Sequence, residues 1–129
     1  MKKTYDFKFN SQLLPENFPR EFDAHIYFES IDLLEATMLR DKMKTIFKDY
    51  TFFVGDMCTE PIGPHPTPMF EANFPLEHFS EIVLWLMKER GGFSVLVHPL
   101  TGDDIYDHTQ GAMWLGTSVR LKYDVLAQE

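Results

Sequence analysis

The chain has 129 residues, of which 44% are hydrophobic and 15% aromatic, and its formal net charge is −8 at pH 7. This length fits a single domain, residues 1–129, with enough apolar material to fold without disulfides or a structural metal. The 20 acidic residues against 12 basic ones, with no Lys/Arg cluster, argue against nucleic-acid and anionic membrane partners.

The first half of the chain predicts a lead-in, a strand, a helix and a second strand. Residues 1–20 are polar and contain two prolines, which predicts an extended lead-in. Residues 22–29 alternate apolar and polar side chains, the pattern of a half-buried strand. A helix is predicted from an N-cap at Ser30 to about Lys48, and a strand over 50–54. The predicted apolar stripe of the helix consists of Leu34, Met38, Leu39, Met43, Ile46 and Phe47.

The second half repeats this order after a proline-rich loop. Residues 58–68 contain four prolines, which predicts a stiff loop. Residues 69–74 and 93–98 alternate as strands, and a helix between them ends at Gly91-Gly92. Residues 113–125 could add a further strand. The order is that of a ferredoxin-like βαββαβ domain of the α+β class, with a C-terminal extension, both helices on one face of an antiparallel sheet and spatial strand order 4-1-3-2.

Strand periodicity predicts which side chains face away from the helices. If the apolar side chains of 22–28 face the helices, His25 and Tyr27 face the opposite side. The same alternation brings Glu71 of the third strand and His98 of the fourth to that open face. Three neighbouring strands therefore direct two histidines and one carboxylate to a single surface.

These residues admit two metal-binding interpretations. Two histidines and a carboxylate (His25, His98, Glu71) form the ligand set of non-haem Fe(II) oxygenases. Alternatively, His65 from the proline-rich loop completes a His25, His65, His98 set, which Zn or Fe accepts. His108 fits either a general acid/base or an ordinary loop residue.

Ordinary structural roles compete with each of these assignments. A single strand histidine is more often hydrogen-bonded than bound to a metal, and Glu71 on an open sheet face can simply be solvated. Tyr27 and Trp114 could form an aromatic wall or pack in the core. The sequence contains no phosphate-binding glycine loop, serine nucleophile elbow or Cys-x-x-Cys pair, which argues against those chemistries.

Cysteine content and hydropathy favour an intracellular location. Cys58 is the single cysteine, so no intrachain disulfide can form, and a reducing compartment fits best. The first residues lack the apolar core of a signal peptide, and no apolar run is long enough to cross a bilayer. We therefore expect a cytoplasmic protein.

Several spaced motifs resemble one known family, the DOPA 4,5-dioxygenase family of small extradiol ring-cleaving enzymes. The matching segments are residues 22–28, 63–66, 69–71, 97–102, 107–109 and 112–116. The resemblance implies a ferredoxin-like domain that often pairs into a homodimer. It also implies insertion of both atoms of O₂ into a catechol such as L-DOPA, beside its hydroxyls.

The resemblance further implies roles for individual residues. His25, His65 and His98 match metal-site histidines, His108 matches an acid/base, and Glu71 is an alternative member of the metal shell. Tyr27 or Trp114 would hold the aromatic ring. The implied metal is Fe(II), for which Zn(II) could substitute in purified protein. The rival functions are a non-catalytic binding module that uses the open sheet face and a metal enzyme acting on another aromatic substrate.

Overall fold

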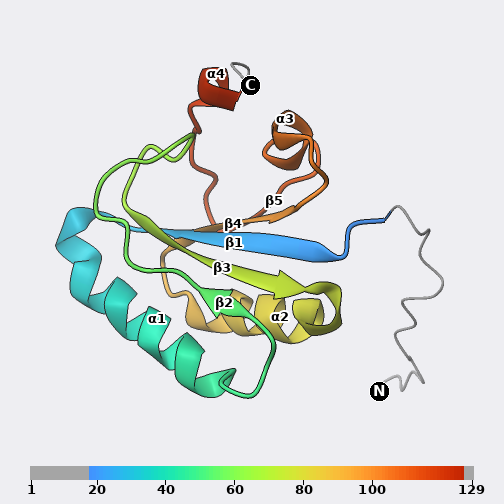
Figure 1. Ribbon diagram of the computed structural model, residues 1–129. Helices are drawn as coiled ribbons and strands as arrows, with labels where there is room; N and C mark the ends of the chain where they lie inside the picture. Colours follow the sequence, from blue (N-terminus) through green and yellow to red (C-terminus); the bar gives the residue numbers. More distant parts are fainter. Residues whose placement is uncertain (1–17, 127–129) are drawn as a thin grey trace, which may run out of the picture.

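The computed structural model describes residues 18–126, which form a five-stranded antiparallel sheet with two long helices against one face (Figure 1). The predicted lead-in lies largely outside the described residues. The strands are β1 (Glu21–Tyr27), β2 (Phe53–Val54), β3 (Met69–Pro75), β4 (Ser94–Pro99) and β5 (Met113–Leu115), in the spatial order β2-β3-β1-β4-β5. The predicted α+β, ferredoxin-like fold and its 4-1-3-2 strand order are therefore confirmed, with β5 added beside β4.

The helices divide between the two faces of the sheet. On one face lie α1 (Leu33–Ile46) and α2 (Phe79–Glu89), each entered through one turn of 3₁₀ helix, Ser30–Asp32 and Leu76–His78. On the other face lie the short helices α3 (Asp104–Asp107) and α4 (Tyr123–Leu126) (Figure 1). Within the described residues, no helix combines the length and apolar character that a membrane span needs.

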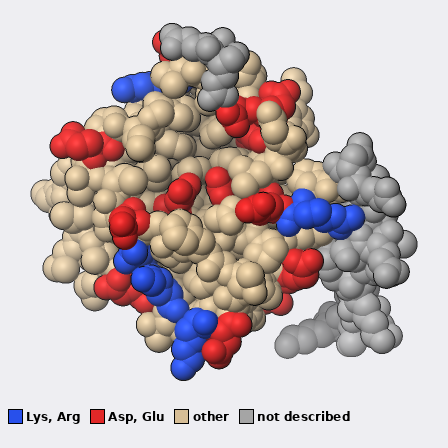
Figure 2. Space-filling view, in the orientation of Figure 1, with Lys and Arg blue, Asp and Glu red and all other residues tan. Residues whose placement is uncertain are grey.

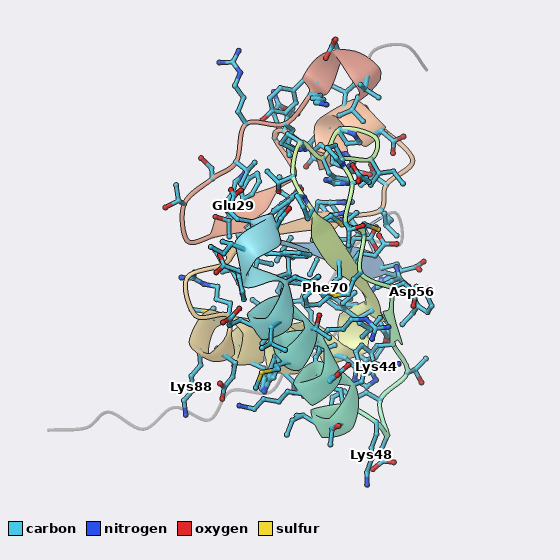
Figure 3. All side chains as sticks on the ribbon, turned by 90° about the vertical axis from the view of Figure 1, so that its left-hand side faces the viewer. Glu29, Lys44, Lys48, Asp56, Phe70 and Lys88 are labelled. Carbon is cyan, nitrogen blue, oxygen red and sulfur yellow. The ribbon has the colours of Figure 1, made fainter. Side chains whose placement is uncertain are left out.

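The main core fills the space between the sheet and the two long helices. Alternate residues of the three central strands point into it, as the strand periodicity predicts. Phe70, labelled in Figure 3, is fully buried there, whereas the lysines labelled on and after α1 and α2 point outward. Burying an apolar side chain of this size stabilises the folded state by roughly 1.5–3 kcal/mol. The largest fully buried side chains of the main core are Phe70, Phe74, Ile26, Met43, Ile82, Leu86, Val95 and Val97.

The predicted apolar stripe of α1 is partly wrong. Leu34, Met38 and Ile46 are 68%, 62% and 53% exposed, and the buried line runs through Ala36, Leu39, Met43 and Phe47. A helix that lies flat on a sheet buries only a narrow stripe, and the small Ala36 allows a close approach. Ser30 is not the predicted N-cap, because it starts the 3₁₀ turn and α1 begins at Leu33.

The second face of the sheet is covered rather than open. A smaller apolar cluster of Tyr27, Met69, Leu96 and Leu121 packs there with parts of the proline-rich loop and the C-terminal segment. Isolated bridges between Cys58 and Met69 and between Ile62 and His65 order the loop. The space-filling view shows acidic side chains scattered over one face of the molecule and a line of basic ones along α1 (Figure 2). The cover creates an interior in which polar side chains lose their contact with water.

Candidate metal centre

Four histidines from four separate segments meet beneath this cover. His25 comes from β1, His98 from β4, His65 from the proline-rich loop and His108 from the residue after α3. Their exposed fractions are 4%, 2%, 6% and 9% in that order. The remaining histidine, His78, lies on the helical side, with its ring centroid 4.4 Å from that of Tyr50. Burying four imidazoles together costs free energy unless their nitrogens gain hydrogen bonds or bind a metal.

Strand register explains how His25 and His98 approach each other. In the β1–β4 ladder, Asp23 lies opposite His98 and His25 lies opposite Leu96. His25 and His98 are therefore diagonal neighbours on one face, within reach of long side chains. Their Nε2 atoms lie 3.1 Å apart. The ring centroids of His25 and His65 are 4.2 Å apart, and those of His98 and His108 are 4.3 Å apart.

Backbone carbonyls fix the tautomers of two of these histidines. Nδ1 of His98 donates to the carbonyl oxygen of Pro99 at 2.8 Å, and Nδ1 of His108 donates to that of Asp104 at 2.8 Å. A carbonyl can only accept, so both Nδ1 atoms carry a proton. In the neutral form of each ring, Nε2 is the unprotonated nitrogen, and a proton on Nδ1 held by a carbonyl is the arrangement found for histidines that bind metals.

His25 is the unsatisfied member of the cluster. Its Nδ1 is buried and lacks a hydrogen-bond partner among the described residues, with a carboxylate oxygen of Glu71 at 4.0 Å. With its proton on Nε2, His25 donates to the Nε2 lone pair of His98; with its proton on Nδ1, which the Glu71 charge favours, Nε2 of His25 becomes a second lone pair facing that of His98. The 3.1 Å contact is therefore a hydrogen bond in the first tautomer, and in the second it offers two lone pairs to a shared cation. Nitrogens that share one ion at about 2.1 Å lie roughly 3.0–3.4 Å apart in adjacent positions, so the residues fit a metal.

Burial keeps His25, His65 and His98 uncharged at neutral pH. Burial, and then the neighbouring His65, His98 and His108, lower the pKa of His25 well below its usual 6.5. Burial, with His108 and His98, lowers the pKa of His65 to about 4. The pKa of His98 is also lowered, mainly by burial. Neutral imidazole is the form that binds metal ions, so these three histidines can present ligands without first losing protons.

Two carboxylates border the cluster from β1 and β3. A carboxylate oxygen of Asp23 lies 3.9 Å from Nε2 of His98, and the other accepts from the amide of Asn73 at 2.9 Å. Glu71 lies on the Nδ1 side of His25, and its side chain is 40% exposed. Burial and the charge of Asp23 raise the pKa of Glu71. The carboxylate nearest the inward-facing nitrogens is thus Asp23, which we did not predict although it shares the strand parity of His25.

Potential ligand atoms gather in two groups that share His25, each with all atoms within 4.8 Å of one another. These groups are His25, His65 and His108, and Asp23, His25 and His98. The predicted His25, His65, His98 set draws members from both groups. The alternative of two histidines and Glu71 has its carboxylate beside the outer nitrogen of His25.

Aromatic side chains wall the cluster on the side of β5. The hydroxyl of Tyr27 and Nδ1 of His65 share a hydrogen bond of 2.7 Å. The Tyr27 ring stacks on Trp114, with centroids 5.8 Å apart. Burial raises the pKa of Tyr27, so its hydroxyl stays protonated. Tyr27 and Trp114 thus lie together beside the cluster, as both the wall and the core interpretations require.

A buried carboxylate next to His108 anchors α3. Asp107 is 1% exposed and accepts hydrogen bonds from the backbone N–H of Thr101 at 3.0 Å and from its hydroxyl at 2.6 Å. These bonds tie α3 to the end of β4 and hold His108 over the cluster. We did not predict this residue, and its position in the Asp107-His108-Thr109 motif was the available signal.

A ferredoxin-like domain with a buried histidine cluster able to hold a metal is the class that the fold and site define. Residues 22–125 match the family model described as the Dopa 4,5-dioxygenase family. The chain therefore belongs to the DOPA 4,5-dioxygenase family, as the motifs predicted.

Individual relatives agree with this membership. The chain is 34% identical over 108 residues to the DOPA 4,5-dioxygenase of Amanita muscaria, a match over 79% of this chain and 47% of that protein. It is 38% identical over 109 residues to an uncharacterized 21.2 kDa protein of Botryotinia fuckeliana, over 78% and 60%. Each match thus spans less than two thirds of the relative's length. The crystal structure of a candidate dioxygenase from Nostoc punctiforme superposes with a TM-score of 0.75 at 30% identity, over 94% of this chain and 98% of that one.

Proposed function

We propose that the protein is an extradiol dioxygenase that cleaves a catechol such as L-DOPA at a metal ion held by the histidine cluster. The observation that carries the proposal is the 3.1 Å approach of the Nε2 atoms of His25 and His98, inside a cluster of four buried imidazoles. Family membership supports an aromatic substrate and O₂. An Fe(II) ion held by these residues would supply a Lewis-acid and redox centre that a catechol can chelate through both oxygens, which would relieve the spin barrier to reaction with O₂.

Within this proposal the chain's residues have distinct tasks. His25, His65 and His98 would hold the ion, with Asp23 as the carboxylate best placed to assist. The Glu71 carboxylate would favour the proton on Nδ1 of His25 and so direct its Nε2 inward. Imidazoles fixed on a rigid sheet would hold the ion, and with it a bound substrate, in one orientation.

His108 is the proposed general acid/base. It is the most exposed of the four histidines at 9%, and because its Nδ1 donates to Asp104, Nε2 is the nitrogen left to exchange a proton. This nitrogen can accept a catechol proton and return it as the ring opens, a role that typically contributes 10²–10⁴-fold to the rate. Tyr27 and Trp114 would stack against the catechol ring.

Oxygen uptake with product identification tests the proposal. Protein loaded with Fe(II) without oxygen should consume about one O₂ per catechol after L-DOPA or catechol is added. The product should be a yellow ring-opened aldehyde acid, and His98→Ala should abolish the reaction. Uptake that yields hydrogen peroxide and a quinone would contradict ring cleavage. The cytoplasmic location, a homodimer and replacement of Fe(II) by Zn(II) remain predictions; light scattering tests the dimer and metal analysis tests Zn(II).

A further inference from the structure

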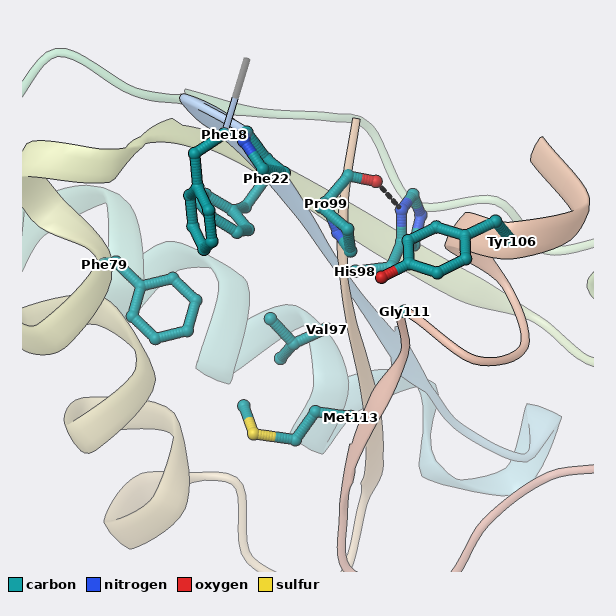
Figure 4. A pocket seen from close by; sticks show the side chains of 10 residues that line it. Phe18, Phe22, Phe79, Val97, His98, Pro99, Tyr106, Gly111 and Met113 are labelled. Atoms are coloured by element: carbon teal, nitrogen blue, oxygen red, sulfur yellow. Dashed lines mark hydrogen bonds between the residues drawn. The ribbon is translucent and has the colours of Figure 1, made fainter. Parts of the chain in front are cut away.

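An apolar pocket of 240 Å³ lies beside His98 at the end of β4 (Figure 4). β5 pairs with β4 only as far as Met113 opposite Val97, so beyond Val97 the side of β4 that faces away from β1 has no strand partner in the described sheet. The pocket wraps around this side of β4. Val97 and two phenylalanines of the helical side line one part of it, and His98 and Tyr106 line the other. It therefore connects the histidine side of the sheet with a hydrophobic recess.

The lining of this pocket is almost entirely hydrocarbon. Phe22, Phe79, Val97 and Met113 form most of its wall, and no Lys, Arg, Asp or Glu lies among the described residues that line it. Its polar side-chain groups are the His98 imidazole and the Tyr106 hydroxyl. A carboxylate or ammonium group placed there would lose its water without gaining an ionic partner, which is strongly unfavourable.

The size of the pocket fits a substituent rather than a whole ligand. Pockets that enclose a drug-sized molecule measure roughly 300–1,000 Å³, and this one measures 240 Å³. Gly111 contributes to this space, because a Cβ there would lie 2.7 Å from the Tyr106 ring and would displace it. A short alkyl chain that extends from a ring near His98 would fill the recess.

We propose that this pocket receives the ring substituent of the substrate, so that the site prefers catechols with a short uncharged alkyl substituent to those with a charged side chain such as that of DOPA. The inference rests on the proposed function, because it assumes that the catechol ring is held beside His98. It concerns only which catechol the site selects.

Binding to the Fe(II)-loaded protein without oxygen tests this preference. We expect affinity to rise about fourfold for each carbon added from catechol through 4-methylcatechol and 4-ethylcatechol to 4-propylcatechol. L-DOPA should bind no more tightly than unsubstituted catechol. Independently of turnover, the Met113 methyl NMR signal should shift when 4-propylcatechol is added and stay in place when L-DOPA is added.

A positive charge placed in the pocket wall should reverse the preference for uncharged over negatively charged ring substituents. Met113 is 40% exposed on the edge strand, so we expect Met113→Arg to fold. The variant should lose the increase in affinity with alkyl chain length, and it should bind a carboxylated catechol such as 3,4-dihydroxyhydrocinnamate more tightly than the wild type does. Met38→Arg, on the 62% exposed Met38 of α1, is the matched control and should leave the series unchanged.

The two proposals fail in different ways. If the iron-loaded protein binds unsubstituted catechol but gains nothing from alkyl chains, the pocket assignment is overturned and the proposed function stands. An unaltered preference in Met113→Arg, or tighter binding of L-DOPA than of 4-propylcatechol, would also overturn it. A protein that binds no catechol at all contradicts the proposed function, and the pocket assignment falls with it.

Discussion

At the scale of single residues, His25 is the point on which the site depends. It belongs to both groups of potential ligand atoms, and its buried Nδ1 is without a hydrogen-bond partner in the described part of the chain. Strand alternation predicted that His25 and His98 share a face. Their approach to 3.1 Å depends on the β1–β4 register, which periodicity does not determine.

Replacing His25 should therefore remove the metal while the fold survives. We expect His25→Ala to reduce Fe(II) content to below about a tenth of that of the wild type, because each metal ligand contributes strongly to affinity. Elemental analysis measures the content, and circular dichroism checks the fold. His78→Ala, which removes a histidine remote from the cluster, should keep full metal content. Equal iron in both variants would contradict the assignment.

His108 should separate catalysis from metal binding. His108→Gln should keep the metal and lower kcat about 10²–10⁴-fold, the usual contribution of a general acid/base. Steady-state kinetics and metal analysis on the same sample measure both effects. If this variant lost its iron as His25→Ala does, His108 would instead be a ligand, as its grouping with His25 and His65 allows.

At the scale of elements, the strands whose apolar side chains face the helices were the best-predicted parts of the fold. The strands alternate because one face meets the helices, so β1, β3 and β4 were predicted closely. The covering of the other face could not be predicted, because the C-terminal segment packs there through contacts distant in sequence, such as Leu121 against Tyr27 and Leu96. For the same reason Asp107 was missed, since its partner Thr101 becomes evident only once α3 is folded.

The α3 anchor should matter for both stability and His108. Asp107→Ala leaves the N–H and hydroxyl of Thr101 without their acceptor, and we expect a loss of about 1–3 kcal/mol in the free energy of unfolding. Denaturant unfolding measures this loss, and hydrogen exchange over residues 101–108 should increase. Asp124→Ala, at an exposed carboxylate of α4, is the control and should change stability by less than about 0.5 kcal/mol. Similar stability of the two variants would show that the anchor is unimportant.

At the scale of the whole molecule, a cluster of buried neutral histidines makes the metal-free protein sensitive to acid. Folded His25, His65 and His98 have lowered pKa values, whereas in the unfolded chain they titrate near 6.5. The unfolded state therefore binds more protons as pH falls below 6.5. The stability that these groups provide is complete above that pH and is lost as pH approaches about 4, the pKa of folded His65.

Thermal unfolding of metal-free protein should show this dependence. We expect Tm to fall steadily between pH 7 and pH 4.5. The raised pKa of Glu71 stabilises the folded state as the pH falls, but this single group is outweighed by the three histidines with lowered pKa values. His65→Gln should flatten the decline. A Tm that stays constant across this range would contradict the buried neutral cluster.

The most direct test of a metal-dependent catechol site is a titration of activity with iron. Metal-free protein is given increasing Fe(II) without oxygen, and the rate of oxygen uptake with a catechol is then measured at each ratio. We expect the rate to rise linearly and to stop rising at about one iron per chain, because four of the five described histidines form a single cluster around His25, and the fifth, His78, lies apart from it. Uptake that is independent of iron, or the absence of uptake from any catechol at full loading, would contradict the account.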